Sequence, residues 1–392
     1  MGERRGWLIA NVIAQLTFGL LAMTICIPSM QDWPAQFGAP QATVQLAFSG
    51  YVVTYGGLQL VYGPWSDRIG RKPVLMFGLA VALCGSLLAV FASSLAVLIA
   101  ARVLQGAGCA ASMVMGRALV HDFFEGSERT RVMALVGMTM GFVPPTATLL
   151  GGQLHVRIGW QANFVLLCAM ALLLLAAAWR LPSRAHPATV HTRGLRELVA
   201  GYGQLARQPS FTWYVMLLAA TTGTFYAFLG GAPIVLRGYG VTPDTLGWYI
   251  MTPPIAYIVG NILTTRLIRT YSEYRIMLTG QLLTLASLLL VLALGIFGPS
   301  SPWSLSLPLI LLGIGHGLLV PPSLAGTVGL VPALAGSAAA VAGVMQQFGG
   351  AVGGYTVGLI PDARQVDLAL ALLAWSSLGL AALLMLRARI AR

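Results

Sequence analysis

The chain has 392 residues, of which 57% are hydrophobic and only 9% are charged. A soluble domain usually carries about 25% charged residues, so we expect lipid to surround most of this chain. Its net charge of +12 comes from arginines in small groups between apolar segments. A nucleic-acid-binding protein would gather them in one stripe, and this distribution therefore argues against a nucleic-acid partner.

The apolar segments predict about twelve membrane-spanning helices, because a hydrocarbon core of about 30 Å needs roughly 20 apolar residues per helix. A run that begins at Trp7 is too long for a cleaved signal peptide, and it is predicted to be the first span. The expected spans are 7–29, 43–62, 74–92, 95–116, 130–152 and 160–181, then 211–232, 244–265, 275–297, 305–325, 335–359 and 366–386.

A polar stretch over 182–209 divides the chain into two parts. The sequence therefore predicts an all-α membrane protein with a six-helix bundle at 1–181, a linker at 182–209 and a second six-helix bundle at 210–392. Nineteen basic residues fall on the side of the termini and linker, and only Arg157, Arg237 and Arg364 fall on the other. By the positive-inside rule, we expect both termini and the linker to lie in the cytoplasm.

The residues between the second and third spans read GPWSDRIGRKP, from Gly63 to Pro73. We call residues 63–73 the gate segment. Two long helices must reverse direction there, and glycine freedom together with helix-breaking Pro64 and Pro73 is expected to allow the reversal. Asp67 is unusual in this basic segment, and it can neutralise nearby arginines or lie at a helix N-terminus.

The fourth span contains the sequence RVLQGAG, beginning at Arg102. Arg102 lies about seven residues inside the expected span 95–116. Inserting a charge well inside a span into the membrane costs about 2.5–3.5 kcal/mol, so Arg102 should face water or a partner; snorkelling of its side chain to the membrane edge is the alternative. The fifth span contains VPPTATLLGG, with Pro144, Pro145, Gly151 and Gly152.

These motifs resemble those of the major facilitator superfamily. The gate segment matches the family pattern GxxxDRxGRK at every fixed position, RxxQGxG resembles its fourth-helix motif, and the fifth-span sequence resembles in part the antiporter motif APxxAPxxGG, with Thr148 at the second proline. Further similarities at Val44, Tyr62, Arg117 and Gly231 narrow the resemblance to the bicyclomycin/chloramphenicol resistance (Bcr/CflA) branch of drug:proton antiporters. The resemblance implies a cytoplasmic gate formed by Gly63, Asp67, Arg68, Gly70, Arg71, Lys72 and Asp122, and it links Arg102 to proton coupling.

One family feature is missing. The branch normally carries an aspartate in the first helix four residues before a proline, and Thr24 occupies that position here, before Pro28. Proton coupling needs a group whose charge changes during the cycle. The candidates are Arg102, His316 near a membrane midplane and Asp32; packing or capping roles remain open for the last two, and a structural role for Asp122.

Aromatic and amide side chains suit the binding of amphipathic ligands. We expect the substrate cavity to be lined by residues drawn from Gln15, Thr24, Cys26, Tyr51, Tyr55, Gln59, Phe225, Tyr226, Tyr257 and Gln346. The resemblance thus implies a monomeric, proton-driven exporter of small drug-like molecules in a bacterial inner membrane, one that needs no cofactor or metal. An importer, exchanger or facilitator of a nucleobase or sugar is the alternative, while an integral membrane enzyme is disfavoured because no His, Asp or Cys cluster suits catalysis.

Overall fold

The computed structural model describes residues 2–181, 203–331, 334–360 and 364–390. These residues contain helices and no strand, as expected where a bilayer leaves backbone polar groups no water to bind. They group into two compact units that divide within 182–202, and residues 243–247 group with the first unit. Most of the predicted linker, including residues 182–202, lies outside the described residues.

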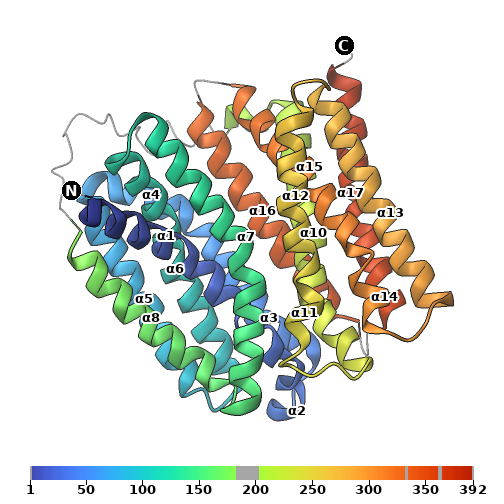
Figure 1. Cartoon of the computed structure of the whole chain (residues 1–392), viewed down its shortest axis with the longest axis horizontal. Coiled ribbons are helices and arrows are strands. Elements are labelled where there is room, and N and C mark those ends of the chain that lie inside the picture. The colour runs from blue at the N-terminus through green and yellow to red at the C-terminus, as the bar shows by residue number, and fades with distance from the viewer. Residues whose placement is uncertain (1, 182–202, 332–333, 361–363, 391–392) are drawn as a thin grey trace. The chain divides into compact units, whose positions relative to one another are not determined.

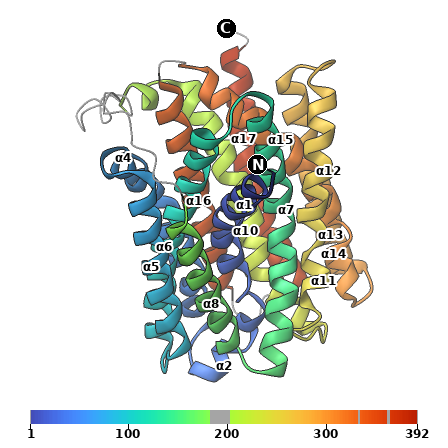
Figure 2. The ribbon, with the colours of Figure 1, turned by 60° about the vertical axis from the view of Figure 1, so that its left-hand side comes forward.

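The first unit is built from helices that follow the predicted spans closely. Its elements are α1 (Gly2–Thr24), η1 (Pro28–Gln31), α2 (Trp33–Phe37), α3 (Gln41–Gly57), α4 (Gln59–Ile69), α5 (Arg71–Val90), α6 (Leu95–Phe123), α7 (Gly126–Arg157) and α8 (Gln161–Trp179). Figures 1 and 2 show α5 lying beside α6 and α8, and these pairs are in contact.

The second unit contains α10 (Pro209–Gly238), α12 (Thr252–Leu267), α13 (Glu273–Phe297), α14 (Pro302–Ser306), α15 (Leu309–Gly329), α16 (Ala335–Gly358) and α17 (Gln365–Ile390). The short α11 (Leu246–Ile250) precedes α12. Within this unit α10 packs against α16 and α17, and α15 packs against α12 and α13. The predicted spans near 244–265 and 305–325 are each interrupted, between α11 and α12 and between α14 and α15.

Nine helical segments of the described chain are long and apolar enough to span a membrane. The other three predicted spans coincide with α3–α4, α7 and α16. Helices approach closely at glycines: a Cβ on Gly108 of α6 would lie 2.2 Å from the backbone nitrogen of Ala82 on α5. Small residues are what allow such close packing in a bilayer, where lipid tails offer no hydrophobic driving force between helices.

The structure corrects the expected shape of the gate segment. Gly63 and Pro64 do not end the second span, because α4 continues through both to Ile69. A proline removes one backbone hydrogen bond and can be accommodated inside a helix when neighbouring groups compensate. The reversal is instead made at Gly70 alone, with φ 97° and ψ 157°, a conformation essentially reserved for glycine. Helix α1 itself ends at Thr24, and the candidate first span continues through η1 to Gln31.

Candidate functional site

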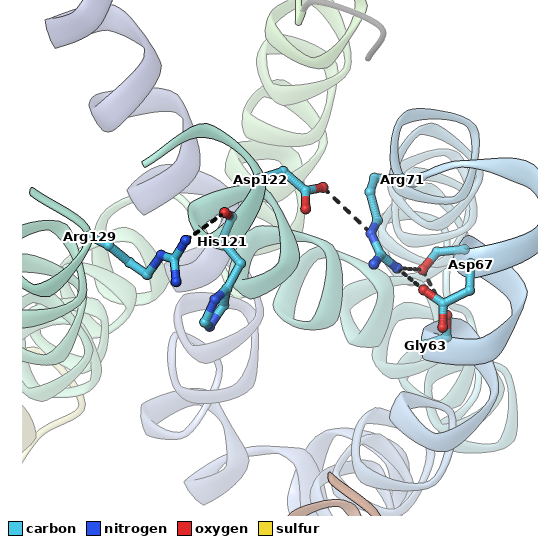
Figure 3. A network of polar contacts seen from close by, with 7 residues as sticks. Gly63, Asp67, Arg71, His121, Asp122 and Arg129 are labelled. Carbon is cyan, nitrogen blue, oxygen red and sulfur yellow. Dashed lines mark hydrogen bonds and ion pairs between the residues drawn. The ribbon is translucent and has the colours of Figure 1, made fainter. Parts of the chain in front are cut away.

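Arg71 links three elements at the gate segment. Its Nη1 donates to Asp67 Oδ1 at 2.5 Å and also to the Ser66 hydroxyl, while its Nε lies 3.7 Å from Asp122 Oδ2. Figure 3 shows the guanidinium between the two carboxylates, which come from α4 and α6. Because α5 begins at Arg71 directly after Gly70, the glycine reversal is what aims this side chain back at Asp67.

The charges of this network are accessible to water. The side chains of Asp67 and Asp122 are each 32% exposed and that of Arg71 is 21% exposed. Ion pairs at such positions contribute about 0–1 kcal/mol each. The arrangement is therefore specific in geometry but weak enough to be broken and remade.

The turn between α6 and α7 lies next to this network and is closed by Arg129. Its Nε donates to the Phe124 carbonyl at 2.9 Å. Its Nη2 donates to the His121 carbonyl at 3.3 Å (Figure 3). Arg129 was not predicted from the sequence as a site residue, since a hydrogen bond to a backbone carbonyl does not depend on the partner's residue type. Arg68, predicted to belong to the gate, is exposed.

Lys72 points to a different helix from Arg71. Its Nζ donates to the carbonyls of Trp179 at 2.6 Å and Leu181 at 3.0 Å. These carbonyls lie at the C-terminal end of α8, where backbone acceptors have no partner within the helix. The gate segment is thereby attached to the last helix of the first unit.

Arg102 is fully buried within the first unit. Its Nη1 donates to the Ala22 carbonyl at 2.8 Å and to Gln105 Oε1, and weaker contacts at 3.4 Å reach the carbonyls of Met23 and Ala47. Its guanidinium carbon lies 4.2 Å from the centroid of the Tyr51 ring. The expected partner is thus supplied by carbonyls of α1 and α3 and by an aromatic face, which suits a cation buried in a span.

A second layer of polar contacts holds Gln105 in place. Gln105 Nε2 donates to Ser86 Oγ at 2.7 Å, and this hydroxyl donates to the Ala82 carbonyl at 2.8 Å. Because both groups are buried, leaving either without its partner would cost free energy. Arg102 therefore connects α1, α3, α5 and α6 through one chain of hydrogen bonds.

The glycines of the fifth-span motif mark the close packing of α7. A Cβ on Gly151 would lie 1.8 Å from the Ile25 carbonyl oxygen, and one on Gly152 would lie 1.9 Å from that of Pro243. Pro144 and Pro145 remain inside α7. Thr148, at the position where the family pattern has proline, donates its hydroxyl to the Pro144 carbonyl at 2.9 Å.

The remaining coupling candidates belong to different units. Asp32 follows η1 and its Oδ2 lies 2.8 Å from His155 Nε2 of α7. His316 is buried in α15, and its ring has no hydrogen-bond or ion-pair partner among the residues that the structure describes. His155 was not among the candidates predicted from the sequence, although its spacing of four from Gly151 places it on the same helix face.

Several predicted cavity residues of the first unit are buried in contacts within and between helices. Gln15 is buried and donates to the Leu174 carbonyl of α8 and to Asn11. Thr24 is buried and donates to the Leu20 carbonyl, one turn back on α1. Cys26 is buried in the turn that follows α1.

The aromatic candidates of this unit form a stack. The rings of Tyr51 and Tyr55 lie 5.8 Å apart and nearly parallel, and Tyr51 Oη donates to the Gly19 carbonyl at 2.7 Å. The amide of Gln59 donates to the carbonyl of Tyr55 at 3.0 Å. The stack therefore adjoins Arg102, whose guanidinium lies over the Tyr51 ring.

The candidates of the second unit gather between α10 and α16. Gln346 Nε2 lies 3.5 Å from Thr222 Oγ1, and Tyr226 Oη donates to Gln347 Oε1 at 3.3 Å. The Phe225 ring adjoins Tyr226 at 6.0 Å between centroids. Tyr257 lies elsewhere, half-buried on α12, and Thr222 and Gln347 are additional polar groups that the sequence analysis missed.

The chain is similar to known membrane transport proteins along most of its length. The model of the Major Facilitator Superfamily matches residues 8–354. The chain is 30% identical over 370 residues to Multidrug resistance protein D of Escherichia coli (strain K12), covering 94% of this chain and 92% of that protein. It is 29% identical to the Chloramphenicol resistance protein of Pseudomonas aeruginosa, covering 90% and 85%. The crystal structure of a mutant of the nucleoside transporter NupG shares the fold with a TM-score of 0.78 at 10% identity, covering 97% and 99% of the two chains.

Proposed function

Because the chain belongs to the Major Facilitator Superfamily, we propose that it is a secondary active transporter that exports small drug-like molecules by alternating access, in exchange for protons. Its similarity to a multidrug resistance protein extends over 94% of its length. This coverage, rather than a local motif match, is the observation that carries the proposal. Full-length similarity includes both the gate segment and the helices that would enclose a substrate.

The network around Arg71 supports the role of a gate. A gate must close specifically and open readily, and Arg71 satisfies both conditions by contacting Asp67 and Asp122 at partly exposed positions. In this proposal the gate segment lies on the cytoplasmic side of the inner membrane, with the termini and linker. Loss of its ion pairs would permit the cytoplasmic opening to form.

The placement of acids favours neutral or zwitterionic substrates. Among the described residues, each acid lies in the first or last three residues of its helix or in a connection. A carboxylate in the middle of a span is the feature that would attract a cationic drug. Arg102, a buried cation, further disfavours positively charged ligands near α1 and α6.

Transport into inverted membrane vesicles tests this proposal directly. A panel of neutral, zwitterionic and cationic antimicrobial compounds, including chloramphenicol, is offered to vesicles with and without an acidic lumen. We expect accumulation of neutral or zwitterionic compounds that depends on the pH gradient and disappears with nigericin. Equilibration independent of the gradient would indicate a facilitator, and the absence of uptake across the panel relative to protein-free vesicles would contradict drug transport.

A further inference from the structure

One face of α7 contacts the segment that follows α1 at two successive turns. At Gly151 the two backbones approach so closely that a Cβ would lie 1.8 Å from the Ile25 carbonyl oxygen. Four residues later, His155 Nε2 lies 2.8 Å from Asp32 Oδ2. Residues four apart share a helix face, so the glycine contact and the polar pair form one continuous joint between α7 and residues 25–32.

The protonation of His155 in this arrangement follows from its partner. An ionised carboxylate can only accept hydrogen bonds, so Nε2 must carry a hydrogen and donate it to Asp32. The other ring nitrogen, Nδ1, is buried and has no hydrogen-bond partner among the described residues. The His155 side chain is 12% exposed, whereas that of Asp32 is 43% exposed. The neutral ring is therefore compatible with this packing, because its Nδ1 then carries a lone pair and needs no acceptor.

We infer that His155 and Asp32 form a proton-binding site of the first unit, with Nδ1 of His155 as the atom that takes up the proton. This inference rests on the proposed exchange of substrate for protons. On protonation, an N–H bond forms at Nδ1, the ring becomes a cation, and Asp32 keeps its negative charge and its bond to Nε2. Histidine is suited to this task because its charge changes between pH 5 and 8.

Proton uptake at this site has a mechanical consequence. A new N–H donor at Nδ1 would be buried without an acceptor, which costs free energy. An arrangement in which water reaches Nδ1 removes that cost, while the ion pair with Asp32 is retained. Protonation therefore favours loosening of the contact between Gly151 and Ile25, while His155 stays paired with Asp32, and deprotonation favours the close contact at Gly151. The site thus couples the protonation of His155 to the packing at Gly151, one of the two glycines of the fifth-span motif.

The surroundings contain few competing charges. The elements packed nearby, α2, α3 and α8, contain no charged side chain. On α7 itself Arg157 is exposed, and the nearby Asp244 contributes its backbone carbonyl to Gln153. Arg102 on α6 donates to the carbonyls of Ala22 and Met23 on α1. Asp32 is therefore the acid in direct contact with the imidazole.

The direct test is nitrogen-15 NMR of histidine rings in the full-length protein in nanodiscs, titrated from pH 8 to pH 5. The signal of His155 is assigned by its loss in His155→Gln. We expect this ring to gain a hydrogen at Nδ1 within the range, and Asp32→Asn to require more acidic solution for the same change. Arg157→Gln, an exposed change two residues away, is the matched control and should have the smaller effect. A ring that stays neutral at pH 5, or that titrates identically in Asp32→Asn, would overturn the inference.

Transport by the same variants separates this inference from the proposed function. For a panel compound that the wild type accumulates, His155→Gln and Asp32→Asn should lose most gradient-driven accumulation while keeping gradient-independent counterflow, which also shows that each variant is folded. Undiminished gradient-driven accumulation in both variants would refute the site. If the wild type itself shows no gradient-driven accumulation, proton exchange fails as the function, and the NMR titration still decides whether His155 binds the proton.

Discussion

The Nζ of Lys72 lies 2.6 Å from the carbonyl oxygen of Trp179, and it also donates to the carbonyl of Leu181. A cation at a helix C-terminus is stabilised by the helix dipole and by the unpaired carbonyls of the last turn. This contact joins the start of α5 to the end of α8, beside the point where the chain leaves the first unit. The gate segment is thus fixed to two places, to α6 through Arg71 and to α8 through Lys72.

The contact of Lys72 can be measured chemically, because Lys72 is the single lysine of the sequence. Reductive methylation of the native protein should therefore modify only Lys72 and the N-terminal amine. Two charge-assisted hydrogen bonds should slow the reaction at Lys72 by about tenfold relative to the unfolded chain. Mass spectrometry gives both rates, and the N-terminal amine is the internal control. Equal rates at Lys72 in native and unfolded protein would show that the contact does not persist in solution.

The two acids around Arg71 should differ in importance. Asp67 contacts Nη1 at 2.5 Å, whereas Asp122 lies 3.7 Å from Nε. We expect Asp67→Asn to reduce the transport rate by about tenfold and Asp122→Asn by about two- to threefold, since shorter charge-assisted bonds are stronger. Substrate affinity should remain nearly unchanged in both. Rates from inverted vesicles and affinities from equilibrium binding check this order, and unchanged turnover in Asp67→Asn would remove the gate assignment.

The extent of the spans was predictable because it follows from the length of each apolar segment, whereas the gate role of the residues around Arg71 stays a prediction. The shape of the gate segment was predicted incorrectly at Gly63 and Pro64. Both residues have the chemistry of helix breakers, but the structure keeps them inside α4 and places the reversal at Gly70. Local propensity does not decide between such positions when packing outweighs it, as in α4, where Tyr62 and Ser66 on either side of the two residues are buried.

The two glycines of the gate segment should therefore tolerate alanine differently. A Cβ at Gly63 would meet nothing within 4 Å, whereas Gly70 has a φ of 97° that alanine rarely adopts. We expect Gly70→Ala to destabilise the protein by about 1–3 kcal/mol and Gly63→Ala to leave its stability unchanged or slightly raised. Thermal unfolding of the two variants in the same detergent gives the comparison. A loss of transport in a stably folded Gly63→Ala would reveal a close approach to Gly63 in another state of the cycle.

The partner of Arg102 shows a second limit of prediction from sequence. Its burial and need for a partner follow from its position in the fourth span. The partners themselves include carbonyls of Ala22, Met23 and Ala47, and any residue could supply a carbonyl. The same limit applies to Arg129 and Lys72, whose acceptors are also backbone atoms. Among these partners, Gln105 is the one that belongs to the sequence motif containing Arg102.

The guanidinium of Arg102 should not be replaceable by another cation, because its N–H donors point in several fixed directions. Lysine offers one compact ammonium group, which cannot reach α1, α3 and Gln105 together. We expect Arg102→Lys to lower the free energy of unfolding by about 1.5–3 kcal/mol, the range for hydrogen bonds to charged groups. Gln105→Glu is the matched test from the other side, since it keeps the contact with Arg102 but removes the amide donor to Ser86. If Arg102→Lys is as stable as the wild type, a positive charge alone is sufficient at this position, without the several hydrogen bonds of the guanidinium.

Thr24 on α1 occupies the position where the family pattern has an aspartate, so a substitution there can test how the charge of a substrate affects its transport. Thr24 is fully buried and follows Met23, whose carbonyl accepts a hydrogen bond from Arg102. A carboxylate at this position would be costly to bury without a partner, and the guanidinium beside the end of α1 supplies one. Thr24→Asp would add to the buried spans the kind of charge that attracts cationic ligands, and we expect it to increase uptake of tetraphenylphosphonium into inverted vesicles by about tenfold, the effect of roughly 1.4 kcal/mol of added attraction. Thr24→Asn, equal in size but neutral, should remain at the wild-type level. If the two variants behave alike, polarity rather than charge governs this position, and the proposed preference for neutral substrates does not arise from the missing acid on α1.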